Sequence, residues 1–201
     1  MSRAAFVLLM GLCATGEGIA GVQVAFTPGH AQMLVLDTLN RAQSHIDLAA
    51  YSFTSEPVVS ALLAAQQRGV QVRVVVNAKT AGEKYGKAAY LANQGIAVRL
   101  NGQYSIQHNK FALVDRHTVQ TGSANYTASA FSRNAENVVV IDNEPAVAMA
   151  YQQAFEQLWK ESNKLVKISV IFFGWVPEAV GFRLWQKTDS NKKPQVIFQS
   201  T

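Results

Sequence analysis

The sequence predicts an α/β fold in which a mixed, mostly parallel central sheet carries helices on both faces. Runs rich in β-branched residues, such as 70–76, alternate with amphipathic segments up to about residue 100, which is the pattern of successive strand–helix–strand units. After residue 107, two short apolar runs enclose a polar turn and indicate an antiparallel hairpin. Because 49% of the 201 residues are hydrophobic, the chain is long enough to form one domain with a substantial core.

The first half of the domain is predicted to contain four strands with helices between them. The Thr27-Pro28 pair marks a helix start, since a capping hydroxyl before proline is typical of a first turn. Ser55-Glu56-Pro57 marks a second start, and Gly69 and Gly95 are helix stops. The expected strands are 22–26, 46–53, 70–76 and 96–100, and the expected helices are 28–43, 56–65 and 83–94.

The second half is predicted to begin with the hairpin and to end with a long helix. Its strands are expected at 110–114 and 118–121, joined by a turn at 115–117. A short helix at 125–132, a strand at 137–141 and an amphipathic helix at 144–159 follow. The apolar run 168–176 is too short to cross a membrane as a helix. The last forty residues are compatible with an extra hairpin, an interfacial element, or a frame-shifted end that does not pack.

The two ends of the chain are expected to lie outside the catalytic domain. Arg3 precedes an apolar run from Ala4 to Ala14, and small residues at 18–20 suit signal-peptide cleavage after Ala20. The sequence therefore predicts a signal peptide at 1–20, a catalytic domain at 21–162 and an extension of unknown role at 163–201. A periplasmic or secreted location is expected, where the loss of Cys13 with the signal leaves no thiol for disulfides or zinc.

The basic charge of the chain comes mostly from its last segment. The formal net charge is +5, and residues 163–201 contribute +4 of it. Residues 21–162 are therefore close to neutral, so the alkaline character of the chain is weak support for nucleic-acid binding by the catalytic domain.

The segment from His108 to Asn125 carries the chemistry. It reads H-N-K-F-A-L-V-D-R-H-T-V-Q-T-G-S-A-N and holds an imidazole, an ammonium, a hydroxyl and an amide within eighteen residues. These groups suit attack on a phosphodiester, because the imidazole can act as nucleophile or proton carrier while the others hold phosphate oxygens. On a strand, His108 and Lys110 would point to the same face. No H-x-H, H-E-x-x-H or cysteine pair is present, so we expect no metal and no cofactor.

This segment matches H-x-K-x4-D-x6-G-S-x-N and thereby resembles the phospholipase D superfamily. The matching positions are His108, Lys110, Asp115, Gly122, Ser123 and Asn125. The segments 50–54, 67–70 and 134–137 are also similar to the small secreted bacterial endonucleases of that superfamily, and the resemblance covers about 22–160. It implies the phospholipase D/nuclease fold and a metal-independent phosphodiesterase.

The resemblance also implies roles for individual residues. His108 and Lys110 would be catalytic, and Lys110, Ser123 and Asn125 would bind the phosphate, although turn capping is an alternative for the last two. Glu136 would orient the histidine, or else pair with Arg133 as an ordinary ion pair. Asp115 and Gly122 are expected to be structural. The other histidines, at positions 30, 45 and 117, are expected to be surface or cap residues.

The motif occurs once, whereas the chemistry requires two histidines, one to attack phosphorus and one to protonate the leaving oxygen. The other histidines lack a lysine two residues on. We therefore expect a homodimer in which two copies of His108 meet at a two-fold axis. The favoured function is a non-specific endonuclease cutting DNA, and RNA as a further option, through a phosphohistidine. The alternative is a phospholipase D acting on lipid head groups, with membrane contact through the tail, for which the sequence offers no support.

Overall fold

An open sheet of eight strands organises the described residues, which are 20–82 and 86–165 of this computed structural model. All of them belong to one compact unit. The strand order across the sheet is β1-β7-β6-β5-β2-β3-β4-β8. The strands are β1 (Gly21–Phe26), β2 (His45–Ala50), β3 (Gln71–Asn77), β4 (Ala97–Asn101), β5 (Phe111–Val114), β6 (Thr118–Gly122), β7 (Asn137–Asp142) and β8 (Asn163–Lys164).

Parallel pairing is confined to the half of the sheet that the strand–helix–strand units build. β2 pairs with β3 and β3 with β4 in parallel, whereas the other neighbouring pairs are antiparallel. The mixed α/β class is confirmed, but the expectation of mostly parallel pairing is wrong. One physical reason is the hairpin, since a tight turn can join β5 and β6 only as antiparallel neighbours, and β5 enters the sheet antiparallel to β2.

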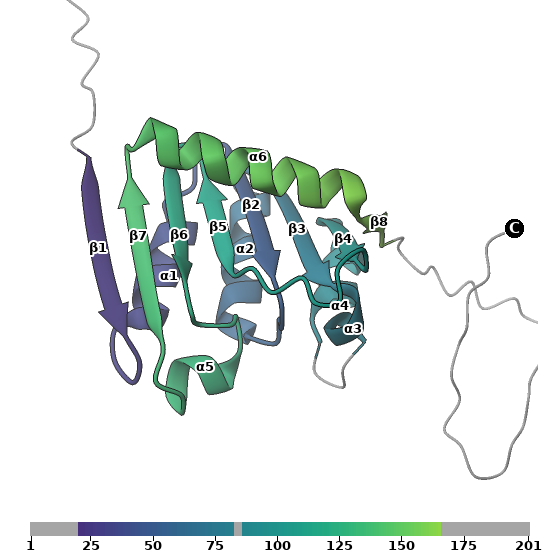
Figure 1. Ribbon diagram of the computed structural model, residues 1–201, viewed down its shortest axis with the longest axis horizontal. Coiled ribbons are helices and arrows are strands. Elements are labelled where there is room, and N and C mark those ends of the chain that lie inside the picture. The colour runs from purple at the N-terminus through teal and green to yellow at the C-terminus, as the bar shows by residue number, and fades with distance from the viewer. Residues whose placement is uncertain (1–19, 83–85, 166–201) are drawn as a thin grey trace, which may run out of the picture. The chain divides into compact units, whose positions relative to one another are not determined.

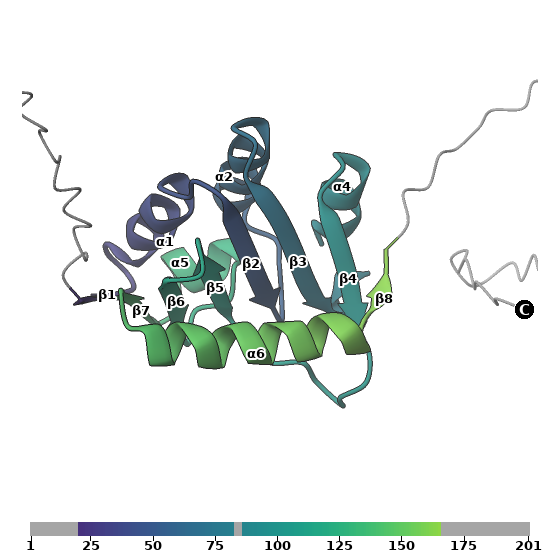
Figure 2. The ribbon, with the colours of Figure 1, turned by 90° about the horizontal axis from the view of Figure 1, so that it is seen from above.

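Helices cover both faces of the sheet, as predicted (Figure 1, Figure 2). Helices α1, α2 and α4 lie on one face, and α6 crosses the other face along nearly its whole width. The short helices α3 and α5 lie at the ends of strands. The helices are α1 (Ala31–Asn40), α2 (Glu56–Gln67), α3 (Ala78–Ala81), α4 (Ala88–Asn93), α5 (Ala128–Ser132) and α6 (Pro145–Glu161).

Side chains alternate between the two faces along the central strands, so the helices on each face pack against a separate hydrophobic core. Leu48 is fully buried in the large cluster that includes α1 and α2, whereas its neighbour Ala49 is buried in a second cluster with Phe155 of α6. Burial of a side chain such as Phe155 stabilises the fold by about 1.5–3 kcal/mol. Arg73 bonds Asp47 and Glu156 at 2.7 and 2.6 Å, and these ion pairs tie α6 to the sheet.

Two helices begin later than predicted. Helix α1 begins at Ala31 because Thr27, the expected cap, instead hydrogen-bonds the backbone of Asn134 and Glu136. Helix α4 begins at Ala88, five residues after the expected start. Hydrogen bonding of Thr27 to a residue more than 100 positions away cannot be deduced from local sequence.

The expected signal peptide and most of the expected extension lie outside the described residues. Asn163 and Lys164, the first residues of that extension, form the edge strand β8 and pair with β4. Among the helices that the structure describes, none combines the length and apolar character needed to cross a membrane.

Candidate active site

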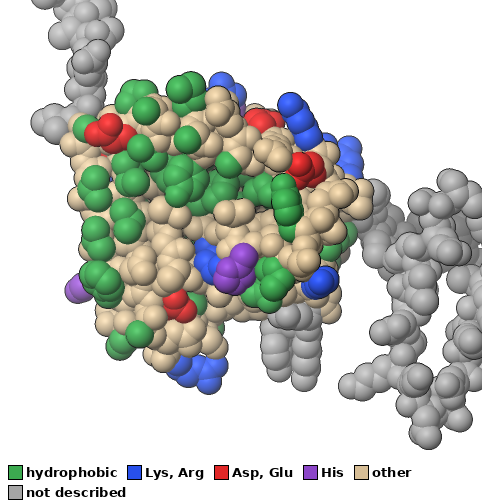
Figure 3. Space-filling model, viewed as in Figure 1, with side chains coloured by type: hydrophobic (Ala, Val, Ile, Leu, Met, Phe, Trp, Pro, Cys, Tyr) green, Lys and Arg blue, Asp and Glu red, His purple; other side chains and the backbone are tan. Residues whose placement is uncertain are grey.

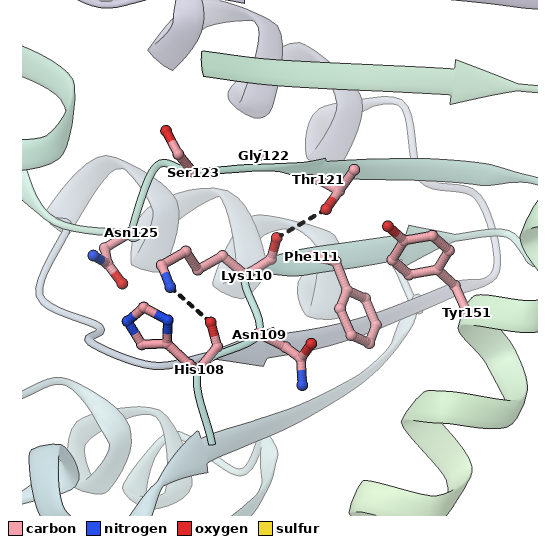
Figure 4. A pocket seen from close by; sticks show the side chains of 9 residues that line it. All are labelled: His108, Asn109, Lys110, Phe111, Thr121, Gly122, Ser123, Asn125 and Tyr151. Atoms are coloured by element: carbon pink, nitrogen blue, oxygen red, sulfur yellow. Dashed lines mark hydrogen bonds between the residues drawn. The ribbon is translucent and has the colours of Figure 1, made fainter. Parts of the chain in front are cut away.

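An open pocket of about 450 Å³ lies where β5 begins and β6 ends, on the face that α6 partly covers (Figure 4). On this side of the molecule, a histidine and a basic side chain lie next to each other at the surface (Figure 3). Eight of the nine lining residues fall within the segment 108–125 singled out by the sequence. The lining residues are His108, Asn109, Lys110, Phe111, Thr121, Gly122, Ser123, Asn125 and Tyr151.

His108 presents its imidazole at the mouth of this pocket. It is exposed, and its ring lies edge-on to Tyr51 with the two centroids 4.7 Å apart. His108 and Lys110 precede β5 and are not in a strand, which corrects the expected strand start at 110. Both nevertheless line the pocket, from the segment that leads into β5.

Lys110 is the buried cation of the site. Its ammonium donates to the carbonyl oxygen of His108 at 2.6 Å and lies 5.6 Å from the centre of the Tyr51 ring. Burial lowers the pKa of Lys110, and the nearby charge of Glu136 partly opposes this effect. A cation held in this way is available to a phosphate that enters the pocket.

Asn125 and Ser123 both line the pocket but differ in their hydrogen bonding. The Asn125 amide lies beside His108 and Lys110 (Figure 4), and its Oδ1 is buried without a partner among the described residues. The Ser123 hydroxyl donates to Glu136 at 2.5 Å and accepts the backbone N–H of Asn137 at 3.0 Å. An amide oxygen and a phosphate oxygen both accept, so a phosphate contact of Asn125 would come from its amide N–H groups. Ser123 is already engaged, and the phosphate contacts of both residues stay predictions.

Glu136 is held in place by neighbours from three segments. One carboxylate oxygen accepts from Ser123 and the other from the Asn134 amide at 2.9 Å. Its backbone N–H donates to Thr27 at 2.8 Å. The alternative partner Arg133 bonds Ser129 instead. Within the described part of this single chain, no hydrogen bond joins Glu136 to His108, so its histidine-orienting role stays a prediction.

Asp115 lies at the opposite end of β5, away from the pocket, and braces the start of β2. Its carboxylate accepts the backbone N–H groups of Gln43, Ser44 and His45 at 2.9, 2.7 and 2.9 Å, and the Ser44 hydroxyl at 2.8 Å. Burial raises the pKa of Asp115, but these hydrogen bonds outweigh it, and the net pKa is lowered. The contacts are those of a structural residue.

Gly122 is required by the close approach of β6 and β7. A Cβ at this position would lie 2.2 Å from the carbonyl oxygen of Asn137, and its φ of +150° is one that other residues rarely adopt. The absence of a side chain thus brings β6 next to β7 and allows Ser123 to reach Glu136.

The other histidines do not line the pocket. His30 caps the start of α1, and His45 begins β2 near Asp115. His117, in the hairpin turn, lies 3.2 Å from Asp142. His108 is therefore the one imidazole of the described residues at this pocket.

Sequence reasoning missed Tyr51, Thr121 and Tyr151. Tyr51 follows the carboxyl end of β2, a position where functional residues of α/β sheets gather, and that rule was a usable signal. Tyr151 comes from α6 and packs against Phe111 with centroids 4.9 Å apart. The helical pattern of α6 does not distinguish a pocket residue from a core residue.

Fold and site together define an α/β protein that presents an exposed histidine beside a buried lysine and an unpartnered amide. Comparison with known proteins identifies this class. Residues 35–159 match the family model described as cardiolipin synthase, PLD-like domain. The solved structure of Nuc from Salmonella typhimurium, a phospholipase D family member, is 38% identical, with a TM-score of 0.72 over 74% of this chain and 99% of that chain. The chain belongs to the phospholipase D superfamily.

Other proteins similar to this chain are named for different activities. Mitochondrial cardiolipin hydrolase from Xenopus tropicalis is 37% identical over 61% of this chain and 58% of that protein. Phospholipase D from Rickettsia felis is 35% identical over 66% of each chain. The chain thus spans less than two thirds of these relatives. NucT from Helicobacter pylori has a TM-score of 0.68 at 19% identity, over 73% of this chain and all of that one, and supports the fold alone.

Proposed function

We propose that this phosphodiesterase is a metal-independent, non-specific endonuclease that hydrolyses DNA, and RNA as a second substrate. The observation that carries the proposal is the exposed His108 imidazole beside the Lys110 ammonium and the Asn125 amide in one open pocket (Figure 4). A compact chain with one motif, matched over nearly the whole length of Nuc, supports this activity over others. The expected signal peptide would place the enzyme in the periplasm or outside the cell.

The chemistry proceeds in two displacements. A neutral His108 nitrogen attacks phosphorus, a nitrogen–phosphorus bond forms, and the bond from phosphorus to the leaving oxygen breaks. A second histidine donates its proton to that oxygen and then removes a proton from the water that hydrolyses the phosphohistidine. Lys110 donates to the phosphate oxygens, and its positive charge stabilises the negative charge that develops on them.

The second histidine comes from a second copy of the chain. His108 is exposed on an open face, and a two-fold axis through this face would bring two copies together. The exposed apolar side chains of Tyr104 and Ile106 line a groove beside His108, and an interface would cover them. In that dimer, Glu136 of either copy can orient an imidazole by accepting a hydrogen bond from its other nitrogen.

A lipid-directed phospholipase D is the second candidate. It is favoured by the similarity to a cardiolipin hydrolase and to a phospholipase D at 37% and 35% identity. The near-neutral charge of residues 21–162 also gives nucleic acid no particular advantage. The shorter coverage of these relatives counts against it.

Purified protein in EDTA separates the two candidates. It is incubated with plasmid DNA, with single-stranded RNA, and with vesicles of cardiolipin or phosphatidylcholine, and a His108→Asn variant is the control. We expect cleavage of DNA by the wild type and a loss of more than about 10³-fold in the variant. Hydrolysis of either lipid with intact DNA would overturn the endonuclease proposal.

Mixed dimers test the shared site. A tagged His108→Asn chain is co-expressed with wild type, and the heterodimer is isolated by its single tag. We expect its activity to lie close to that of the inactive homodimer. Half of the wild-type activity, or full activity in a chain shown to be monomeric, would contradict a site made from two protomers.

A further inference from the structure

The catalytic histidine lies on a segment that no regular structure supports. Residues 102–110 belong to no helix or strand, and β5 begins only at Phe111. A histidine that attacks phosphorus must be held within a fraction of an ångström, because small misplacements of reacting groups cost large factors in rate. Something other than a strand ladder must therefore fix the backbone at His108.

Two buried amide side chains hold the backbone on either side of His108. Gln107 and Asn77 are each only 1% exposed. The Asn77 Oδ1 accepts the backbone N–H of Gln107 at 3.0 Å, and the Gln107 Oε1 accepts the backbone N–H of Asn109 at 2.6 Å. The backbone N–H groups of the two residues that flank His108 are thus both bonded to side chains that solvent does not reach.

Each amide is in turn anchored to the central sheet. The Gln107 Nε2 donates to the carbonyl oxygen of Ala50, the last residue of β2, at 3.3 Å. Asn77 is the last residue of β3, the parallel neighbour of β2. The carbonyl oxygen of His108 itself accepts from the Lys110 ammonium. The backbone of the nucleophile is therefore tied to two adjacent strands and to the catalytic lysine.

We propose that Gln107 and Asn77 are positioning residues that set the His108 imidazole for attack on phosphorus. This inference rests on the proposed phosphodiester chemistry of His108. Neither amide lines the pocket that contains Lys110 and Asn125, so both act through the backbone of His108 and not on the substrate. Their loss should lower the rate of the chemical step and leave substrate affinity nearly unchanged.

Steady-state kinetics on the aryl phosphodiester bis(p-nitrophenyl) phosphate test the proposal with the full chain. This substrate carries neither a base nor a lipid, so the result is independent of the natural substrate. We expect Gln107→Leu to lower kcat on the order of 10²-fold with KM changed less than about twofold. Gln120→Leu is the matched control, because Gln120 is also buried and bonds Tyr126 at 2.7 Å away from the pocket. Equal kcat in the two variants would overturn the proposal.

Variants of Asn77 decide the case if Gln107→Leu does not fold. Asn77→Ala removes the acceptor for the Gln107 N–H, whereas Asn77→Asp keeps an oxygen there, and the Nδ2 that it loses bonds none of the described residues. We expect the loss of kcat in Asn77→Ala to be restored at least tenfold in Asn77→Asp. Equal kcat in two folded variants would show that this hydrogen bond does not position His108.

Amide hydrogen exchange separates failure of this inference from failure of the proposed function. If the wild type cleaves no phosphodiester, the endonuclease proposal fails, and hydrogen exchange still tests whether Gln107 and Asn77 hold the backbone around His108. The backbone amides of Gln107 and Asn109 should be protected in the wild type and should exchange faster in Asn77→Ala and Gln107→Leu respectively. Rapid exchange of both amides in the wild type would overturn the proposal.

Discussion

Asp115 should contribute to stability and not to catalysis, although it belongs to the same motif as His108. In Asp115→Ala, the three backbone N–H groups and one hydroxyl that it accepts lose their partner. Hydrogen bonds to a charged group contribute about 1.5–3 kcal/mol each, but Gln43 and Ser44 are exposed, so water replaces part of the loss. We expect the free energy of unfolding to fall by about 2–4 kcal/mol, and Tm by roughly 5–15 °C for a chain of this size.

Thermal unfolding and activity are measured on the same preparations of wild type, Asp115→Ala and Asp115→Asn. The asparagine keeps one acceptor oxygen and should lose less stability than alanine. At a temperature where all three are folded, kcat should agree within about threefold. A variant with unchanged Tm and a kcat lowered by 10² or more would refute the structural role.

The pH dependence provides a second check on Asp115. Its pKa in the folded protein is lowered from 3.8. The stability it contributes is therefore fully present above pH 3.8 and is lost as pH falls through the lower folded value. The difference in Tm between wild type and Asp115→Asn should be constant from pH 5 to 7 and shrink below pH 3.8. A constant difference throughout would contradict the ionised state assigned to Asp115.

Three further substitutions test the site. Burial lowers the pKa of Lys110 below 10.5, so Lys110→Met should abolish activity and, in urea titrations at pH 7, raise the free energy of unfolding by about 1 kcal/mol. This gain should fade as pH rises toward 10.5, and its absence would contradict a cost of burying the charged Lys110. Gly122→Ala places a Cβ 2.2 Å from the Asn137 carbonyl oxygen and should lower the free energy of unfolding by about 3 kcal/mol or more in the same titration. A decrease under about 1 kcal/mol would show that β6 and β7 separate easily. Glu136→Gln should lower kcat on the order of 10²-fold and shift the pH profile of kcat, with little change in KM. An unchanged pH profile would contradict the role of Glu136 in orienting the histidine.

The sequence alone was sufficient to predict the motif and most of the helices and strands. The β-branched run that became β3 and the turn that became the hairpin are local signals, because strand propensity and turn geometry depend on neighbouring residues. In the turn, Asp115 and Arg116 adopt positive φ values of 51° and 65°, which suit a two-residue hairpin loop. The six motif positions likewise fall in one short segment, and five of them line one pocket, whereas Asp115 lies at the other end of β5.

Other features depended on residues that meet only in the folded chain. Thr27 changed from a helix cap to a partner of Glu136, and Tyr51, Tyr151 and Asn77 lie near the His108 segment although they come from separate parts of the chain. The mostly antiparallel pairing depends on which strands become neighbours in the sheet, as where β5 lies antiparallel beside β2. Sequence by itself determined the chemistry of the site, because the reactive groups are close along the chain. Tertiary structure decided how they are held, because hydrogen bonds between distant segments have no local signal.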